Sequence, residues 1–198
     1  MTDPSDVVVV AGVRTPFIRS WSLLRQIHPV ELGRMVVREA VERAEIDPGD
    51  VDEVIAGNIA TPADSSNIAR VIQLRAGIPE QAPAFTVNRN CASGLQCLVD
   101  AAYRIQAGHA DLIVAVAVES MSSVPLLLKP DAEKVWVDAG RSRGILGRAA
   151  AFTGLRPSHL VPEPALPKGL TDPVSGLNMG ETAEKLAREF GIGREEQD

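Results

Sequence analysis

The stretch FTVNRNCASGLQCLVDAAYRIQAG, residues 85–108, decides the fold of this chain. It begins with an apolar run typical of a buried strand and passes through the polar triplet Asn88, Arg89 and Asn90. From Cys91 onward, apolar residues recur at the spacing of an amphipathic helix that ends at Gly108. A strand that turns directly into a helix is the repeating step of an α/β sheet, and Cys91 stands at that turn.

The same step recurs on both sides of this stretch. The apolar runs predict strands, and the amphipathic runs between them predict helices. The predicted strands cover residues 6–12, 51–59, 84–87 and 110–120, and the predicted helices cover residues 29–46, 65–78 and 91–108. Continuous apolar strands are typical of a sheet covered on both faces. We therefore expect an α/β fold with a mostly parallel sheet between helices.

The composition and the hydrophobic periodicity of the sequence change after Ser120. Residues 121–178 are rich in Pro, Gly, Arg and Lys and show weak periodicity, which predicts a loop subdomain outside the layered core. A helical pattern returns at residue 179. The expected organisation is a core over residues 1–120, the loop subdomain over 121–178, and a return helix over 179–198. No further strand follows that helix, so the end resembles a cut through a domain.

Composition limits the partners. The 198 residues are 45% hydrophobic and carry a net charge of −6 with no basic block, which argues against nucleic acid or an anionic membrane as the main partner. The apolar runs are too short to span a bilayer. The acidic start MTDPSD matches neither a secretory signal nor a transit peptide. These features predict a cytoplasmic protein without a transmembrane segment.

The cysteines and histidines exclude two kinds of site. Cys91 and Cys97 are six residues apart, so on one helix their Cα atoms are about 9 Å apart. A disulfide needs roughly 4.4–6.8 Å, and we expect free thiols. His28, His109 and His159 fall in turn-like contexts and predict solvated side chains, none at zinc-ligand spacing from a cysteine. No metal site is expected, and Cys97 shares an apolar face typical of core packing.

Cys91 is the candidate catalytic residue. In the first turn of the predicted helix, free N–H groups and the helix dipole favour a thiolate. Its main-chain N–H can donate to an oxyanion, while Ser93 and Gly94 leave room for a thioester. Arg89 and Asn90 would add polarity at the mouth of this site. The alternative is that Cys91 is a small buried residue, as free cysteines usually are. The residues alone show a nucleophile without a visible base.

Five segments together resemble the thiolases, acyltransferases of ketoacyl-CoA chemistry. They occur in order along essentially the whole chain: RTPF, SSNIAR, NCASGLQ, VESMSSVP and NMGETAEKLAREFGIGREEQD. Within the family, the resemblance is greatest to the thiolase subunit of fatty-acid β-oxidation complexes.

The resemblance implies a mechanism and a set of partners. Cys91 would attack a 3-ketoacyl-CoA, release acetyl-CoA, hold the shortened acyl group as a thioester and pass it to CoA. The loop subdomain would bind CoA, and Met179 would lie near the acyl pocket, unless it only packs at its helix start. Asn178 stands where many thiolases have a histidine. No tightly bound cofactor is implied. Expected partners are further thiolase chains in a dimer or tetramer and a hydratase/dehydrogenase subunit.

The chain departs from the family in length. Thiolases are about twice as long, and their second half supplies an Asn-Glu-Ala-Phe-like segment, a Gly-His-Pro histidine and a Cys-x-Gly cysteine. None of these occurs here. We therefore expect the isolated chain to be inactive. Two alternatives remain: a non-catalytic binding or assembly module on the same scaffold, and a related enzyme that condenses carbon–carbon bonds.

Overall fold

The computed structural model describes residues 6–198, which form two compact units, one ending at Ser123 and one beginning at Val124. Each unit is described by itself. Residues 1–5, which hold most of the MTDPSD start used to predict the absence of a leader, lie outside the described residues.

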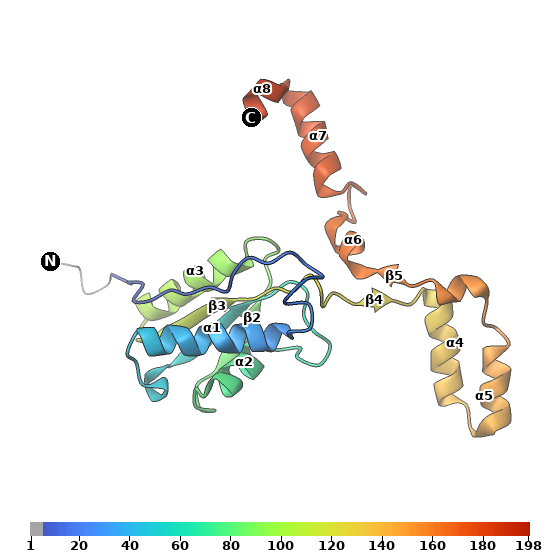
Figure 1. Ribbon diagram of the computed structural model, residues 1–198, viewed down its shortest axis with the longest axis horizontal. Coiled ribbons are helices and arrows are strands. Elements are labelled where there is room, and N and C mark those ends of the chain that lie inside the picture. Colours follow the sequence, from blue (N-terminus) through green and yellow to red (C-terminus); the bar gives the residue numbers. More distant parts are fainter. Residues whose placement is uncertain (1–5) are drawn as a thin grey trace. The chain divides into compact units, whose positions relative to one another are not determined.

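A parallel sheet forms the centre of the first unit. Strand β1 (Glu53–Gly57) lies between β2 (Ala84–Val87) and β3 (Ile113–Ala117), and both neighbours run parallel to it. Val54 pairs with Ala84 on one side and with Val114 on the other. The predicted parallel sheet is therefore confirmed for these three strands (Figure 1).

Helices cover both faces of the sheet. Val54 and Ala56 of β1 belong to a core cluster shared with α1 (Pro29–Arg43) and α2 (Ile68–Ala76). Ile55 points the other way, into a cluster with Cys97 and Ala101 of α3 (Ser93–Gln106). Because side chains alternate along a strand, β1 contributes to two cores at once, and the unit has three layers (Figure 1).

The helix boundaries follow their sequence signals. Pro29 is the first residue of α1, where a missing N–H costs nothing. The side chain of Asn67 caps α2 by accepting from the N–H of Arg70 at 3.4 Å, and Gly77 ends that helix with φ of 91°. Between α1 and β1, a 3₁₀ turn, η1 (Pro48–Asp50), leads into the strand.

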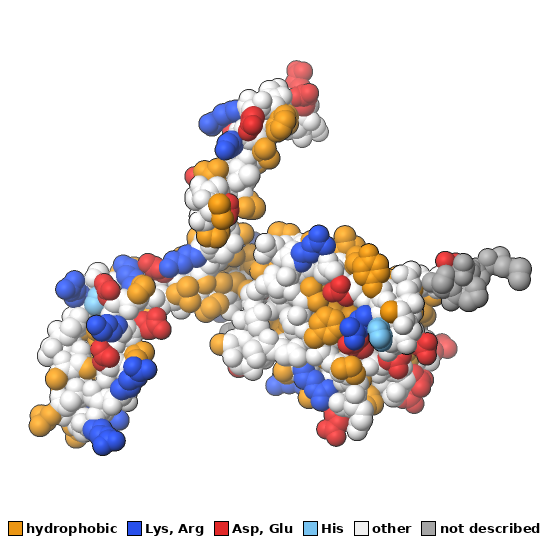
Figure 2. Space-filling view, turned by 180° about the vertical axis from the view of Figure 1, so that it is seen from behind, with side chains coloured by type: hydrophobic (Ala, Val, Ile, Leu, Met, Phe, Trp, Pro, Cys, Tyr) orange, Lys and Arg blue, Asp and Glu red, His pale blue; other side chains and the backbone are white. Residues whose placement is uncertain are grey.

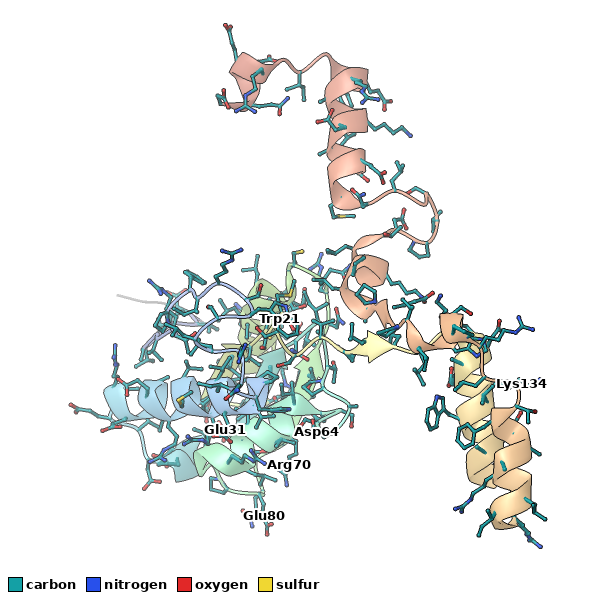
Figure 3. All side chains as sticks on the ribbon, turned by 45° about the vertical axis from the view of Figure 1, so that its right-hand side comes forward. Trp21, Glu31, Asp64, Arg70, Glu80 and Lys134 are labelled. Carbon is teal, nitrogen blue, oxygen red and sulfur yellow. The ribbon has the colours of Figure 1, made fainter. Side chains whose placement is uncertain are left out.

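Polar contacts bind α1 to α2. Glu31 of α1 accepts from Arg34 of its own helix and Arg75 of α2, each at 2.7 Å, and these two guanidinium groups lower the pKa of Glu31. Arg70 on α2 donates to Gln73 at 2.8 Å and to the carbonyl of Ala82 at 3.0 Å. Figure 3 shows Glu31 and Arg70 on their two helices.

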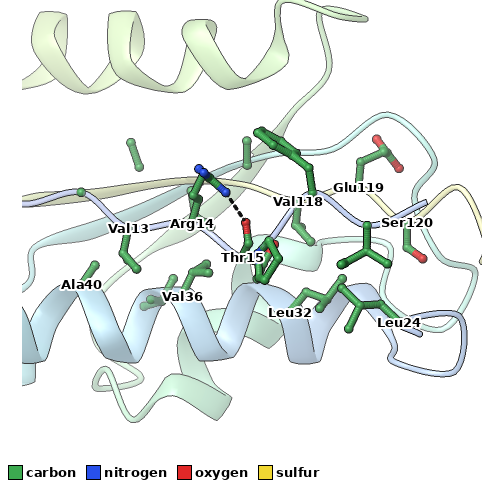
Figure 4. Close-up of a pocket in the computed structure, with 18 of the residues that line it drawn as sticks. Val13, Arg14, Thr15, Leu24, Leu32, Val36, Ala40, Val118, Glu119 and Ser120 are labelled. Carbon is green, nitrogen blue, oxygen red and sulfur yellow. Dashed lines mark hydrogen bonds between the residues drawn. The ribbon is translucent and has the colours of Figure 1, made fainter. Parts of the chain in front are cut away.

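The predicted first strand is wrong. Residues 6–19 form no strand, and Val8, Val9 and Val10 are 67%, 80% and 66% exposed. A strand needs main-chain partners at about 4.8 Å, and within residues 6–198 no strand pairs with the outer edge of β3. A cavity of about 750 Å³ lies between the N-terminal segment, α1 and β3, with Val13 and Val118 on its walls (Figure 4).

The second unit holds more helix than the predicted loop subdomain. Its elements are β4 (Leu126–Leu127), α4 (Pro130–Arg141), α5 (Gly144–Phe152), η2 (Pro157–Leu160), β5 (Glu163–Pro164), α6 (Ala165–Leu170), α7 (Met179–Phe190) and α8 (Arg194–Gln197). Helices α4 and α5 form a hairpin, with Ala132 and Ala139 buried and the rings of Trp136 and Phe152 edge to face at 5.2 Å. The weak pattern arises because alanines, which carry little hydrophobic signal, occupy the buried positions of α4.

A short ladder closes the base of this hairpin. Leu126 of β4 pairs with Pro164 of β5, and Leu127 pairs with Glu163, in antiparallel register. The N–H of Ala165 also donates to the carbonyl of Pro125 at 3.2 Å.

The histidines correct a second prediction. His159 is buried in η2, where its Nδ1 accepts from the N–H of Arg156 at 3.3 Å, so it is not a solvated loop residue. His28 is half-buried and caps α1 by accepting from the N–H of Val30 at 3.2 Å. His109 is exposed, as expected.

Helix α7 begins at a reciprocal cap. The side chain of Asn178 accepts from the N–H of Glu181 at 2.9 Å, and Glu181 accepts from the N–H of Asn178 at 2.8 Å. None of the residues of α7 is buried. Among the described residues, no helix is both long and apolar enough to cross a membrane.

Candidate active site

Cys91 lies just outside α3. The helix begins at Ser93 with Ala92 as its N-cap, so the predicted helical start at Cys91 is wrong by two residues. Asn90, directly before the cysteine, has φ of 49°. This left-handed conformation reverses the chain, and it costs most residues other than glycine about 1–2 kcal/mol, although asparagine adopts it more readily. Hydrogen bonds from neighbouring groups stabilise it.

Ser93 provides that support. Its side chain is buried, its Oγ accepts from the N–H of Arg89 at 2.9 Å, and its hydroxyl donates to the carbonyl of Asn90 at 2.6 Å. The N–H of Ser93 donates to the same carbonyl at 3.0 Å, and the N–H of Asn90 donates to Oδ1 of Asn88 at 3.0 Å. We call residues 88–93 the elbow. Its hydrogen bonds fix the chain on the N-terminal side of Cys91.

The elbow sits directly on the sheet. A Cβ added to Gly57, the last residue of β1, would lie 2.8 Å from the carbonyl oxygen of Ser93. A Cβ added to Gly94 would lie 3.2 Å from Cβ of Ala117, the last residue of β3. Packing against the sheet thus explains the small size of Gly94, and the room it leaves for a thioester stays a prediction. The carboxyl ends of β1 and β3 therefore fix how far the turn that carries Cys91 lies from the sheet.

The two thiols are in opposite environments. Cys91 is exposed, which rules out the alternative that it is a buried residue. Cys97 is 1% exposed and donates to the carbonyl of Ser93 at 3.2 Å, so the prediction of core packing is confirmed. Burial, and then the nearby Asp100 carboxylate, raise the pKa of Cys97 to about 11. Both thiols are free, as predicted.

Three polar residues in or beside the elbow were not predicted to be site residues. Glu119, after β3, accepts from the N–H of Ile59 at 2.8 Å and that of Ala60 at 3.3 Å. Asn58, after β1, is buried and donates to the carbonyl of Val118 at 2.9 Å. Asn88 spans from the elbow to the carbonyl of Ile59 at 3.5 Å.

The sequence contains a pattern from which these three polar residues could have been predicted. Each of the three strands is followed within two residues by Asn or Glu, and carboxyl ends of parallel strands meet at one edge of the sheet.

For two other predicted site residues, the structure shows different surroundings from those expected. The guanidinium of Arg89 donates to Gln96 at 2.5 Å, and Gln96 donates to Asp100 at 2.6 Å, so Arg89 is bonded along α3. Met179 begins α7 in the second unit and is 58% exposed. Its place in an acyl pocket stays a prediction. Cys91 does not line the 750 Å³ cavity, which adjoins the outer edge of β3 instead.

This geometry defines an α/β protein with an exposed cysteine thiol presented at the carboxyl edge of a parallel sheet. An exposed thiol on a rigid turn before a helix can form a thioester. Among the contacts of residues 6–198, none joins a histidine to Cys91. Within residues 6–198, the candidate site therefore holds an exposed thiol on a supported turn, with no histidine in contact with it.

Comparison with known proteins identifies the family. Residues 7–198 match the family model of the thiolase N-terminal domain, and the chain belongs to that family. It is 34% identical over 193 residues to the 3-ketoacyl-CoA thiolase of Erwinia tasmaniensis and 34% identical over 192 residues to that of Escherichia fergusonii. Each alignment covers 97% of this chain and 43% of the relative.

Solved structures agree with this assignment. The crystal structure of the Bacillus anthracis acetyl-CoA acetyltransferase matches with a TM-score of 0.78 and 35% identity, over 96% of this chain and 43% of that one. Human mitochondrial 3-ketoacyl-CoA thiolase in complex with CoA matches with a TM-score of 0.75 and 32% identity, over 94% and 43%. The chain thus spans less than half the length of these relatives.

Proposed function

We propose that this chain carries the nucleophile of a thiolase that transfers acyl groups between 3-ketoacyl-CoA and CoA. The observation that carries the proposal is the exposed thiol of Cys91 on the elbow, in a chain of the thiolase family. The Cys91 thiolate adds to the 3-keto carbon of the substrate. The bond between C2 and C3 then breaks, its electron pair stays on C2, and a proton to C2 gives acetyl-CoA. The thiolate of CoA then displaces Cys91 from the acyl group.

The elbow explains how the chain supports the first step. The N–H groups of Arg89, Asn90, Ala92 and Ser93 all donate within the turn, at 2.9 to 3.1 Å. The N–H of Cys91 is not part of that set, and it is the proposed donor to the oxyanion that forms on the 3-keto oxygen. Because no histidine contacts Cys91 within residues 6–198, we propose that the acid that protonates C2 and the base that activates each thiol come from the part of the thiolase fold that this chain does not span. The chain alone is expected not to turn over.

Finer assignments belong to the same proposal. A CoA thioester substrate is supported by the human relative solved in complex with CoA. The names of the bacterial relatives support a 3-ketoacyl-CoA. We extend the proposal to fatty-acid β-oxidation, a cytoplasmic location, a dimer or tetramer of thiolase chains, and a hydratase/dehydrogenase partner. Within the chain, residues 121–178 would contact CoA, and Met179 would line the acyl pocket.

Acyl mapping tests the proposal. The chain is mixed with a C-terminal segment of a thiolase relative, incubated with acetoacetyl-CoA, quenched in acid, digested and examined by mass spectrometry. The acetyl group is expected on the peptide containing Cys91. Cys97→Ala is the matched control and should keep the label, because the Cys97 thiol is buried and its pKa is raised to about 11.

Two outcomes would refute the assignment. One is label on Cys97, and the other is label that survives in Cys91→Ala. Absence of label, in a mixture where the two segments demonstrably associate, would favour the non-catalytic module.

A further inference from the structure

Arg89 places a positive charge two residues before Cys91, and its exposed side chain is held by a chain of polar contacts. The guanidinium donates to the side-chain oxygen of Gln96 at 2.5 Å. The amide nitrogen of Gln96 donates in turn to the carboxylate of Asp100 at 2.6 Å. Gln96 and Asp100 both lie on α3, so these contacts fix the Arg89 side chain along that helix.

Gln96 keeps the two charges of this polar chain apart. A side-chain amide has both an acceptor and donors, so it can bind a guanidinium and a carboxylate at the same time. Among the ion pairs between residues 6–198, none includes Arg89 or Asp100. The positive charge of Arg89 is therefore held in place without direct contact with a carboxylate that would neutralise it.

The main chain of Arg89 is fixed as well. Its N–H donates to Oγ of Ser93 at 2.9 Å, and its carbonyl accepts from the N–H of Ala92 at 3.1 Å. Because only two residues separate them, the Cα atoms of Arg89 and Cys91 are at most about 7 Å apart. The elbow thus keeps this cation close to the exposed thiol.

Other charged side chains on the surrounding elements are bonded elsewhere. Arg104, in the last turn of α3, forms an ion pair with Glu53 at the start of β1. Glu119 accepts from the N–H of Ile59 at 2.8 Å. Strands β2 and β3 carry no charged residue. On the face of the first unit seen in Figure 2, charges of both signs are interspersed, without a broad basic surface. Within the elbow itself, residues 88–93, Arg89 is the charged side chain.

We propose that Arg89 is a positioning residue whose charge favours the thiolate form of Cys91, and that Gln96 prevents Asp100 from neutralising that charge. A cation beside a thiol stabilises the thiolate, which is the reactive form. For a separation of about 8 Å, in surroundings between water and protein, a unit charge changes the thiolate population about twofold to fivefold. The proposal rests on the proposed role of Cys91 as the nucleophile, but it concerns the thiol before any acyl transfer.

Alkylation of the full chain by iodoacetamide tests this role. The rate at Cys91 is followed against pH, and mass spectrometry of the labelled peptide separates it from Cys97. Arg89→Met should raise the pH midpoint of the rate by about 0.3–0.7 units, which is the twofold to fivefold change expressed on the pH scale. The elbow should persist in this variant, because its bonds at residue 89 come from the main chain.

Two further variants separate the charge from the shape of the side chain. Arg89→Lys keeps the charge and should keep the midpoint of the parent. Gln96→Glu should raise the midpoint at least as much as Arg89→Met, because a carboxylate at this position would bind the guanidinium and neutralise it. Arg38→Met is the matched control and should not move the midpoint. It removes an exposed arginine from α1, which covers the opposite face of the sheet from α3.

Salt gives a second readout that a purely structural role would not move. At about 1 M salt the screening length falls to about 3 Å, so most of the difference between Arg89→Met and the parent should disappear. Circular dichroism of each variant checks that the fold is unchanged.

Four results would overturn the proposal. Arg89→Met could behave as Arg38→Met does, or Arg89→Lys could match Arg89→Met, which would make the shape of arginine and not its charge decisive. The shift could persist at high salt, which would indicate a local rearrangement, or Gln96→Glu could keep the midpoint of the parent. Acyl mapping is independent of these outcomes. If the midpoints move as expected but no acyl group is found on Cys91, the proposed function fails and the effect of Arg89 on the thiol stands.

Discussion

Replacing Ser93 by alanine should loosen the elbow by a predictable amount. Ser93 is 5% exposed, and its hydroxyl makes two hydrogen bonds, one from the N–H of Arg89 at 2.9 Å and one to the carbonyl of Asn90 at 2.6 Å. The variant leaves the Arg89 N–H without its acceptor, which costs about 1–3 kcal/mol for a buried group. The Asn90 carbonyl keeps the N–H of Ser93 as a donor, so its loss is smaller. The expected total is about 2 kcal/mol.

Hydrogen exchange of the α3 amides measures this cost in the unit that contains the elbow. Ser93→Ala should lower their opening free energy by about 2 kcal/mol. The control is Ser123→Ala, whose exposed hydroxyl bonds only to Ser120, and which should change it by less than about 0.5 kcal/mol.

A second substitution tests the cause. Asn90 has φ of 49°, a conformation that glycine adopts without penalty. Asn90→Gly in the Ser93→Ala background should therefore recover about 1 kcal/mol, because the backbone then needs less support. If Ser93→Ala behaves like Ser123→Ala, or if Asn90→Gly recovers nothing, the hydroxyl does not hold the elbow and the reasoning fails.

Two further predictions concern the sheet below the elbow. Gly57→Ala places a methyl 2.8 Å from main-chain atoms of the first turn of α3 and should destabilise the unit by about 1–3 kcal/mol in urea unfolding, whereas Gly140→Ala, with no atom within 4 Å, should be neutral or stabilising. If the two alanine variants are equally stable, the close contact is not limiting. The pKa of Asp52 is lowered by the N–H groups of Leu112 and Asp111, so the stability it gives is present above the unfolded pKa of about 3.9 and is lost as pH falls through the lower folded pKa. Asp52→Asn should remove about 1 kcal/mol at pH 7, a value discounted for its exposure. The difference from the parent should shrink below pH 4, and a constant difference from pH 7 to pH 3 would contradict this origin.

The sheet and the positions of the two cysteines could be predicted from the sequence for separate reasons. The apolar strands β1, β2 and β3 are bounded by clear helix signals, such as Pro29 before α1 and Gly77 after α2. Cys97 lies on the apolar face of α3, and its burial follows from the helical period. Cys91 could be selected because it stands at a strand-to-helix junction.

Other features depend on contacts that a linear pattern does not contain. The run Val8 to Val10 has the composition of a strand, but whether it pairs depends on a neighbour at the edge of β3. The delayed start of α3 depends on the Ser93 hydroxyl, which binds residues before it instead of extending the helix backward. His159 is buried because η2 packs on α4, a contact between segments about 20 residues apart.

The ladder between Leu126 and Pro164 makes the chain leave and return at one point. Everything from residue 128 to residue 162 is therefore a closed excursion whose two ends are held together independently of its content. The entropy of closing such an excursion grows only with the logarithm of its length, and a doubling costs about 0.6 kcal/mol. Insertions, deletions or exchange of the whole α4–α5 hairpin at this point in the chain therefore cost little free energy of loop closure. During evolution, the length and the charge of the hairpin could change while the strands and the elbow that carry Cys91 stay unchanged. Because its two ends are held together, the hairpin can also be exchanged as one segment between relatives.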